Sequence, residues 1–405
     1  MAVGFQGLAK LHPVDGFRLG AVAAGIKKPN RLDLVVMEVA EGSRCACVFT
    51  RNRFRAAPVL VAERHLAGTT PRFILVNTGY ANAGTGEQGL ADAAACCDAV
   101  AALTGVPPAS VLPFSTGVIG ENLPVHRIRD GLPRALESLS ETGWKDAANG
   151  IMTTDTAPKG ASRQIELGGR QVTVTGIAKG AGMIRPDMAT MLAFVATDAD
   201  VLPELLDEAL RHAVERSFNR ITVDGDTSTN DACVLVATGK SPARAVIAKD
   251  SAYQRLVDAV TDVCIALAQS IVRDGEGATR FVTVDVRDGR TEDECRRVAY
   301  AVAQSPLVKT ALFAADPNWG RILAAVGRAG LDDLNVEGVS VYLDDLLIAE
   351  RGARASSYDE SAAQTRMSKD EVTIVVRLGR GSAATTVWTC DFSYDYVRIN
   401  ADYRS

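Results

Sequence analysis

The segment Lys179-Gly-Ala-Gly-Met-Ile-Arg-Pro-Asp-Met-Ala-Thr-Met-Leu192 is the most informative stretch of this sequence. Its glycines allow the backbone to approach neighbouring chains closely, and its proline restrains the turn that they form. The apolar run Met191-Leu-Ala-Phe-Val-Ala196 ends the segment and predicts a buried strand. Thr190 therefore opens a buried strand directly after a turn, with the small residue Ala189 before it.

Thr190 is a candidate nucleophile because the sequence is short of ordinary general bases. No Gly-x-Ser-x-Gly elbow is present, and none of the four histidines stands in a Ser-His or Cys-His pattern (His12, His65, His126, His212). An α-amino group, with a pKa of about 7.7–8.0, can serve as the base instead. Thr190 would acquire one if its hydroxyl attacked the Ala189 carbonyl and the resulting ester were hydrolysed. Without further signals, an ordinary strand threonine is the simpler interpretation.

The composition is that of an ordinary globular protein. The chain has 405 residues and a mass of 42.8 kDa, with 47% hydrophobic and 23% charged residues, which predicts two or three packed units. The net charge of −5, without a basic run, argues against a nucleic-acid partner. The sequence lacks a signal peptide and any apolar stretch of about 18 residues, so a soluble cytoplasmic protein is expected. The eight cysteines include no CxxC pair, which predicts buried thiols and no metal site.

Strand and helix signals alternate along the chain, which predicts an α/β protein. The predicted strands are 72–76, 111–114, 171–177, 191–196, 281–286, 339–343, 372–378 and 385–388. The predicted helices are 90–103, 124–139, 203–217, 251–272 and 292–304. The pattern changes after about residue 281, so residues 281–390 are expected to form a smaller subdomain.

Two nucleotide-binding patterns are incomplete. Gly84-Thr-Gly-Glu-Gln-Gly89 matches GxGxxG, but seven residues separate it from the preceding predicted strand, and no acidic residue ends the next one. Gly239-Lys-Ser241 resembles the end of a P-loop, but Val234 occupies the position of the required glycine. Both patterns favour turns, although a dinucleotide-binding module stays open as an alternative.

Seven segments resemble, in the same order, the glutamate N-acetyltransferases (ornithine acetyltransferases) of arginine biosynthesis. They are Asn77-Thr-Gly-Tyr-Ala-Asn-Ala-Gly-Thr-Gly86, Pro113-Phe-Ser-Thr-Gly-Val-Ile-Gly120, Gly150-Ile-Met-Thr-Thr-Asp155, the Lys179–Leu192 segment, Asp224-Gly-Asp-Thr-Ser-Thr-Asn-Asp231, Arg273-Asp-Gly-Glu-Gly-Ala-Thr279 and Ala315-Asp-Pro-Asn-Trp-Gly-Arg321. The resemblance covers nearly the whole chain, and several of its motifs are about ten residues long.

The resemblance implies a role for each matched residue. Thr190 would carry the acetyl group, after the chain cuts itself between Ala189 and Thr190. Thr116 and Gly117 match the family's oxyanion-stabilising pair, the first through its hydroxyl and the second through its N–H. The positions that hold the amino-acid substrate are matched, besides Thr190, by Thr153, Lys179, Glu276, Asn400 and Ser405. Lys179 can pair with a carboxylate and Glu276 with a cationic group.

The implied fold is the layered α-β-β-α sandwich of the self-processing ornithine acetyltransferases and related aminopeptidases, with a smaller C-terminal α/β subdomain. Residues 1–189 would form an α chain and residues 190–405 a β chain, which stay associated, with two copies of each expected. The implied reaction moves an acetyl group from N-acetylornithine to glutamate through acetyl-Thr190, with no cofactor or metal. The use of acetyl-CoA as a further acetyl donor stays open. A self-cleaving aminopeptidase of the same fold is the alternative function.

Several residues depart from the family pattern. Tyr80 stands where an asparagine is expected, and its bulky ring raises the question of how the local loop is shaped. Cys390 and Tyr394 stand where Thr and His are expected, and Ser405 stands where Thr is common. Ser405 keeps a hydroxyl, and none of these changes removes the nucleophile, the oxyanion pair or Lys179.

Overall fold

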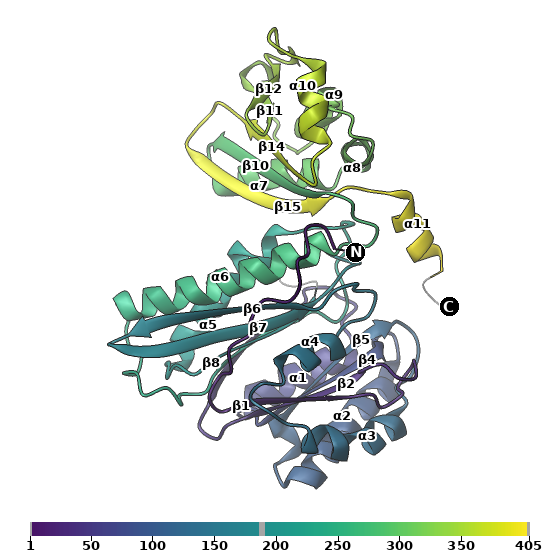
Figure 1. The fold of residues 1–405 in the computed structure, drawn as a ribbon, viewed down its shortest axis with the longest axis vertical. Helices are drawn as coiled ribbons and strands as arrows, with labels where there is room; N and C mark the ends of the chain where they lie inside the picture. The colour runs from purple at the N-terminus through teal and green to yellow at the C-terminus, as the bar shows by residue number, and fades with distance from the viewer. Residues whose placement is uncertain (1, 186–190, 403–405) are drawn as a thin grey trace. The chain divides into compact units, whose positions relative to one another are not determined.

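The computed structural model describes residues 2–185 and 191–402. The chain divides into two compact units, which we call the larger and the smaller unit. The larger unit comprises the described residues of 7–219 and 226–271, and the smaller unit those of 272–402, 2–6 and 220–225. Figure 1 labels the elements of each unit. This division by packing is a separate matter from the predicted cleavage after residue 189, which falls outside the described residues and stays a prediction.

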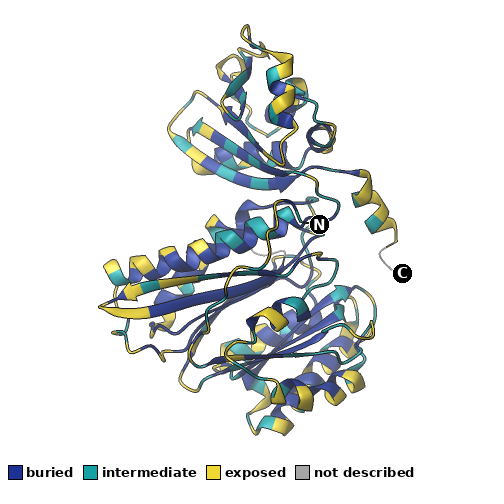
Figure 2. Cartoon of the chain, viewed as in Figure 1, coloured by how far each residue is buried: buried dark blue, intermediate teal, exposed yellow. Residues whose placement is uncertain are grey.

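Two β-sheets form the centre of the larger unit. The first has the strand order β1-β2-β4-β5, with bounds β1 Phe17–Val22, β2 Leu34–Val39, β4 Phe73–Tyr80 and β5 Val111–Val118. The second has the order β3-β9-β8-β7-β6, with bounds β3 Arg44–Phe49, β9 Ala232–Ala237, β8 Leu192–Thr197, β7 Arg170–Lys179 and β6 Lys159–Leu167. Neighbouring strands are antiparallel except for the parallel pairs β4–β5 and β8–β9. All residues of the central strand β8 are buried (Figure 2), as its continuous apolar sequence predicts.

The two sheets pack face to face around one apolar core. Phe114 of β5 and Phe194 of β8 meet edge to face, with 5.3 Å between their ring centroids. Other members of this core come from both sheets, among them Val35, Ile74, Leu112, Ile177 and Val234. Helices α1 (Ala57–Gly68) and α4 (Trp144–Gly150) also contribute side chains to it.

Helices cover the outer face of each sheet. On the first sheet, α2 (Gly86–Thr104) and α3 (Val125–Glu137) share a core with the alternate residues of β2 and β4. On the second sheet, α5 (Pro203–Arg216) packs against β3 and β9, and α6 (Ser251–Arg273) packs against β7. A side chain at Gly176 of β7 would meet Val263 and Leu267 of α6, whereas its neighbour Ile177 points into the core between the sheets. The resulting α-β-β-α order confirms the predicted layered sandwich.

The smaller unit is built on a single mixed sheet. Its strand order is β13-β12-β11-β14-β10-β15, with bounds β13 Ala353–Arg354, β12 Leu346–Glu350, β11 Ser340–Leu343, β14 Glu371–Arg377, β10 Phe281–Gly289 and β15 Ala383–Cys390. Its helices are α7 (Glu292–Ala303), α8 (Pro306–Phe313), α9 (Trp319–Gly327), α10 (Glu360–Met367) and α11 (Tyr394–Ala401). Buried valines of β10 and β14 pack with side chains of α7, α8 and α9 in its core. The range 281–390 that the sequence suggests as a subdomain falls inside this unit.

The predicted helices and strands differ from the observed ones by four residues or fewer at their ends. The strand predicted over 72–76 is too short, because β4 continues to Tyr80 through an irregular pairing with β5. Among the described residues, no helix combines the length and the apolar character needed to cross a membrane.

Candidate active site

Three strands of the second sheet meet at Met191 and Leu192, which follow the predicted nucleophile in the sequence. Lys179, the last residue of β7, pairs in register with Leu192, the first residue of β8. Leu192 pairs on its other side with Ala232, the first residue of β9, and the Ala232 N–H donates to the Met191 carbonyl over 2.9 Å. We call this place, formed by Lys179, Met191, Leu192 and Ala232, the β8 end. The predicted cleavage site, 189–190, directly precedes it in the sequence and lies outside the described residues.

A buried carboxylate, Asp155, connects the backbone after Lys179 to Thr153. Its Oδ1 accepts hydrogen bonds from Lys159 Nζ at 2.6 Å and Gly180 N at 2.7 Å, and its Oδ2 accepts one from Thr153 N at 2.9 Å. Burial acts to raise the pKa of this carboxyl, but the charges of Lys159 and Lys179 and the hydrogen bonds outweigh it, and the pKa lies well below its ordinary value. Asp155 is therefore ionised at neutral pH and fixes Thr153 beside the end of β7.

A second buried carboxyl, Asp231, stands directly before β9. The residue is 3% exposed, and its Oδ2 has no hydrogen-bond partner in the part of the chain that the structure describes. Burial raises the pKa of Asp231 well above its ordinary value, although the positive charge of Lys179 acts in the opposite direction. Burial therefore favours the protonated form of this carboxyl, which can donate a hydrogen bond. Since its neighbour Ala232 bonds to Met191, this acid lies beside the β8 end.

Thr116 and Gly117 lie near the end of β5, where the pairing with β4 becomes irregular. Gly117 has a φ of 136°, and a Cβ atom there would lie 2.3 Å from the carbonyl carbon of Gly79, so the position requires glycine. Thr116 is 8% exposed. The backbone at this pair is therefore held in one conformation by the neighbouring strand, as a preorganised oxyanion site requires.

The Asn230 side chain ties this part of β5 to the β8 end. Its Nδ2 donates to the Ser115 carbonyl at 2.9 Å and to the Ala81 carbonyl at 2.6 Å. Ser115 directly precedes Thr116, and Asn230 directly precedes Asp231. The same short segment therefore positions both the predicted oxyanion pair and the buried acid.

Contacts of neighbouring residues thus relate four predicted residues of the larger unit to one another: Thr153 and Lys179 through Asp155, and Thr116 and Gly117 through the bond of Asn230 to Ser115. The nearby residues that the sequence analysis did not assign are Asp155, Asn230 and Asp231. Their position in the sequence is the signal that could have identified them as site residues. Asp155 ends one of the quoted motifs, and Asn230-Asp231 ends another. A motif alone does not reveal that a carboxyl is buried or which lysine it faces.

Two predicted substrate-binding residues meet in the smaller unit. Asn400 of α11 donates from Nδ2 to Glu276 Oε2 at 2.9 Å, and Glu276 is 6% exposed. The hydroxyl of Ser393 begins α11 by accepting from the Asp395 N–H, and it also donates to the Gly277 carbonyl at 2.6 Å. This contact fastens the helix to the loop that carries Glu276. Ser405 lies outside the described residues.

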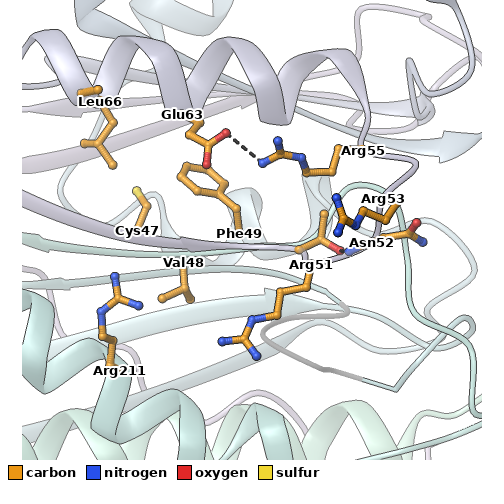
Figure 3. Close-up of a pocket in the computed structure, with 12 residues that line it drawn as sticks. Cys47, Val48, Phe49, Arg51, Asn52, Arg53, Arg55, Glu63, Leu66 and Arg211 are labelled. Carbon is orange, nitrogen blue, oxygen red and sulfur yellow. Dashed lines mark hydrogen bonds and ion pairs between the residues drawn. The ribbon is translucent and has the colours of Figure 1, made fainter.

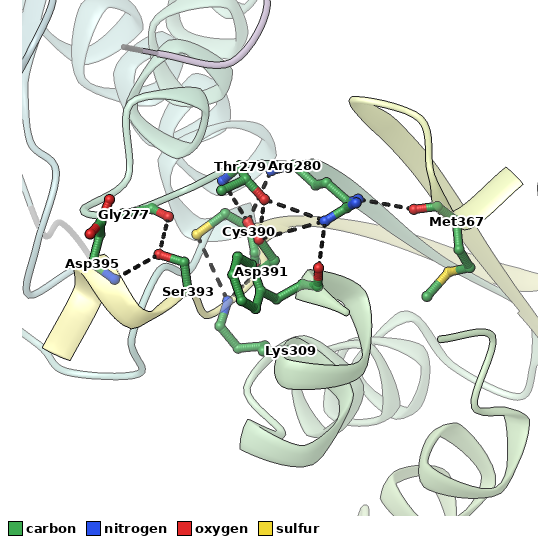
Figure 4. Close-up of polar contacts among 10 residues, drawn as sticks. Gly277, Thr279, Arg280, Lys309, Met367, Cys390, Asp391, Ser393 and Asp395 are labelled. Atoms are coloured by element: carbon green, nitrogen blue, oxygen red, sulfur yellow. Dashed lines mark hydrogen bonds and ion pairs between the residues drawn. The ribbon is translucent and has the colours of Figure 1, made fainter. Parts of the chain in front are cut away.

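The segment before α11 is held by buried polar contacts (Figure 4). Asp391 accepts hydrogen bonds from the backbone N–H groups of Thr279 and Arg280 at 2.8 and 2.9 Å, and from the Thr279 hydroxyl at 2.5 Å. The buried ammonium group of Lys309 donates to the Cys390 carbonyl. These contacts fix the chain between β15 and α11 against the loop before β10.

The structure describes three of the departures from the family pattern, Tyr80, Cys390 and Tyr394. Tyr80 lies at the end of β4 with its backbone carbonyl accepting from Asn77 Nδ2 at 3.1 Å, so no separate loop is distorted by its ring. Cys390 is fully buried, and burial raises the pKa of its thiol to about 11. Tyr394 is 84% exposed and packs edge to face on Phe313.

The glycine-rich loop before α2 is filled by its own side chains. Asn82 Nδ2 donates to the Gly89 carbonyl at 2.8 Å, and the Thr85 hydroxyl donates to Asn82 Oδ1 at 2.7 Å. A Cβ atom at Gly89 would lie 1.9 Å from the Thr85 hydroxyl oxygen. These polar groups occupy the place where a dinucleotide fingerprint would receive its phosphates, which disfavours the dinucleotide-binding alternative. Within residues 2–185 and 191–402, no three His, Cys, Asp or Glu side chains gather as a metal site would require.

Comparison with known proteins identifies the family. The model of the ArgJ family matches residues 18–405. The chain belongs to the ArgJ family. This confirms the resemblance that the sequence motifs indicate.

Relatives in the ArgJ family match the chain over its full length. The arginine biosynthesis bifunctional protein ArgJ of Pseudomonas syringae pv. tomato is 57% identical over 100% of both chains. The protein of the same name from Methylococcus capsulatus is 58% identical over 98% of this chain and 97% of its own. These matches disfavour both the aminopeptidase and the dinucleotide-binding alternatives.

A solved ArgJ structure shares the fold. A crystallised chain of arginine biosynthesis bifunctional protein ArgJ from Bacillus halodurans is 38% identical, with a TM-score of 0.50. The match covers 52% of this chain and 99% of that chain.

Proposed function

We propose that this protein cuts itself between Ala189 and Thr190 and then transfers an acetyl group from N-acetylornithine to glutamate. The observation that carries the proposal is the arrangement at the β8 end, where Lys179 pairs with Leu192 and where Asn230, two residues before Ala232, bonds to the carbonyl of Ser115 directly before Thr116 and Gly117. Its relatives are named for arginine biosynthesis, which is the pathway of these substrates.

The proposed chemistry has two covalent stages. In maturation, the Thr190 hydroxyl attacks the Ala189 carbonyl, the peptide C–N bond breaks, and water hydrolyses the resulting ester to leave a free α-amino group on Thr190. In turnover, this amino group accepts the proton of its own hydroxyl as the oxygen attacks the acetyl carbonyl of N-acetylornithine. The amide C–N bond breaks, and ornithine leaves with the proton. The amine of glutamate then attacks the acetyl ester and restores the hydroxyl.

The surrounding residues have separate roles in this proposal. The Thr116 hydroxyl and the Gly117 N–H stabilise the oxyanion of each tetrahedral intermediate. Lys179 pairs with a substrate carboxylate, and Thr153 lies beside it through Asp155. Glu276 and Asn400 bind the amino-acid part of the substrate, with the Glu276 carboxylate receiving a cationic group, and Ser405 contributes its hydroxyl.

The length of the solved relative supports cleavage. Residues 190–405 make up about 53% of this chain, and the crystallised Bacillus halodurans chain, nearly all of which is matched, covers 52% of it. A precursor divided near residue 190 would produce a chain of that size.

Mass spectrometry of the purified protein tests both stages. We expect two pieces, of 189 and 216 residues, the second beginning at Thr190. Mixing with N-acetylornithine alone should add one acetyl group to the N-terminal peptide of the second piece, and glutamate should remove it. An intact chain that is active, or transfer without an acetylated peptide, would contradict the covalent route.

The relatives are called bifunctional, which favours a second activity at the same nucleophile. We propose acetyl-CoA as a second acetyl donor to Thr190, with glutamate again as the acceptor. Release of coenzyme A thiol that depends on glutamate would test it.

A further inference from the structure

A recess of about 690 Å³ lies beside the edge strand β3 of the larger unit. Figure 3 shows it between α1 and α5, with the loop that follows β3 along one side. We call it the arginine recess after Arg51, Arg53, Arg55 and Arg211, which line it together with apolar side chains that include Phe49. Its volume is within the range of small-ligand sites.

The recess carries an excess of positive charge. Glu63 is the one carboxylate residue among the described side chains that line it, and it pairs with Arg55 at 2.9 Å. Arg211 pairs with Asp207 at 2.7 Å on the surface of α5, where both side chains are about half exposed. The described residues that line the recess therefore include four arginines and one glutamate. Guanidinium groups bind phosphate oxygens in pairs and are the side chains best suited to phosphate recognition.

The arginine recess lies near the β8 end, because its lining residue Phe49 is connected to it by strand pairing. Phe49, the last residue of β3, pairs with Ala232, which pairs in turn with Leu192. Strands lie about 4.8 Å apart, so Phe49 is about 10 Å from the first residue of β8. A ligand bound in the recess could reach the β8 end with a flexible arm.

The loop that follows β3 and carries Arg51 and Arg53 is also fixed to the segment that contains Asp231. The Thr50 N–H donates to the Asp231 carbonyl at 3.0 Å, and the Thr50 hydroxyl donates to the Ser228 carbonyl at 2.8 Å. Asn52 Nδ2 donates to the Thr227 carbonyl at 2.8 Å. The backbone that presents Arg51 and Arg53 is therefore held in place rather than shaped by a ligand.

We propose that the arginine recess binds the phosphate groups of an organic phosphate. Two sources share this chemistry: the nucleotide end of a coenzyme A thioester, whose arm would extend toward the β8 end, and a free nucleotide. The first source rests on the proposed use of acetyl-CoA, whereas the binding of phosphate groups does not.

Equilibrium binding to the processed full-length protein tests the proposal. Coenzyme A, ATP and inorganic phosphate are titrated separately at low salt by calorimetry. At least one of the two organic phosphates should bind, and its Kd should rise tenfold or more in Arg51→Gln/Arg53→Gln, because charge-assisted hydrogen bonds are lost. Added salt should weaken the same binding. Arg51→Lys/Arg53→Lys should keep part of the affinity.

Arg64→Gln is the matched control, because Arg64 is an exposed arginine of α1 that does not line the recess. Its Kd should equal that of the unchanged protein, and all variants should melt at the same temperature. Tighter binding of coenzyme A than of ATP identifies a thioester carrier, and the reverse identifies a free nucleotide. The proposal is overturned if neither organic phosphate binds, or if the glutamine variant binds as tightly as the unchanged protein.

Acetyl transfer from N-acetylornithine to glutamate, measured on the same samples, separates this inference from the proposed function. The glutamine variant should retain that transfer. If the unchanged protein binds an organic phosphate but transfers no acetyl group, the proposed function is rejected and the inference about the arginine recess stands. If it transfers the acetyl group but binds no organic phosphate, the inference about the recess is rejected and the proposed function stands.

Discussion

Replacing Asp155 by asparagine should destabilise the larger unit strongly while keeping the shape of the side chain. The change removes a buried negative charge and takes from Lys159, whose ammonium lies 2.6 Å away, the carboxylate with which it pairs. Breaking a buried ion pair by removing one partner costs about 3–5 kcal/mol of unfolding free energy. The larger unit has 259 residues (7–219 and 226–271), and at about 2.1 cal/mol/K of unfolding entropy per residue the melting temperature should fall by about 6–9 °C.

Thermal unfolding followed by calorimetry, with the pieces examined on a denaturing gel, measures this effect. Asp262→Asn is the control, because Asp262 pairs with Arg163 at 3.7 Å on the exposed surface of the same unit, and surface pairs are worth at most about 1 kcal/mol. Asp155→Asn/Lys159→Met should recover part of the loss, since it removes both charges of the pair. A melting temperature of Asp155→Asn within 2 °C of the control, a threshold of about 1 kcal/mol by the same scaling, would refute the view that Asp155 balances buried lysines.

Four further outcomes are expected. Thr190→Ala should yield one uncut chain of 405 residues on a denaturing gel, and a cut at the same place would exclude Thr190 as the nucleophile of maturation. Thr116→Val should lower turnover by about two to three orders of magnitude in correctly processed protein, with a smaller change in KM, because it removes an oxyanion donor and keeps the shape; near-normal turnover would argue against this role. Lys179→Met should raise KM for N-acetylornithine and glutamate together, since both carry a carboxylate, and an effect on one substrate alone would assign Lys179 to that substrate only. The pKa of Asp155 is lowered on folding. Its contribution to stability is therefore present above the unfolded pKa of about 3.9 and is lost as the pH falls toward the folded value. Melting scans below pH 4 should show this loss of stability in the unchanged protein and a smaller loss in Asp155→Asn.

The sequence predicts elements best where one chain segment carries its own signal. Helix α6 has an amphipathic pattern over more than twenty residues, and its predicted and observed ends nearly coincide. Strand β3, by contrast, reads Arg-Cys-Ala-Cys-Val-Phe and was not predicted, because few of its residues favour strands. Its conformation comes from pairing with β9, which lies nearly 190 residues later. Such non-local pairing leaves no trace in a short window.

The same contrast applies to the candidate site. Lys179, Thr116 and Gly117 could be named as candidates because they stand inside motifs that resemble a family. The presence of Asp155 and Asp231 near these candidates could not be predicted, because it arises from burial and from the charge of a distant lysine. The two carboxyls have the same chemistry, yet the pKa of one is lowered and that of the other is raised, and only the surrounding structure distinguishes them.

The strand order of the second sheet determines what the proposed cleavage would do to folding. In β3-β9-β8-β7-β6, the central strand β8 and its neighbour β9 come from residues after 190, whereas β3, β7 and β6 come from residues before it. A chain cut before folding would have to assemble this sheet from two diffusing pieces, so in the proposed maturation the intact precursor folds first. After the cut, refolding would require the two pieces to meet again. Refolding would therefore become a bimolecular step that dilution slows, and the precursor would be the form that can rebuild this sheet from a single chain.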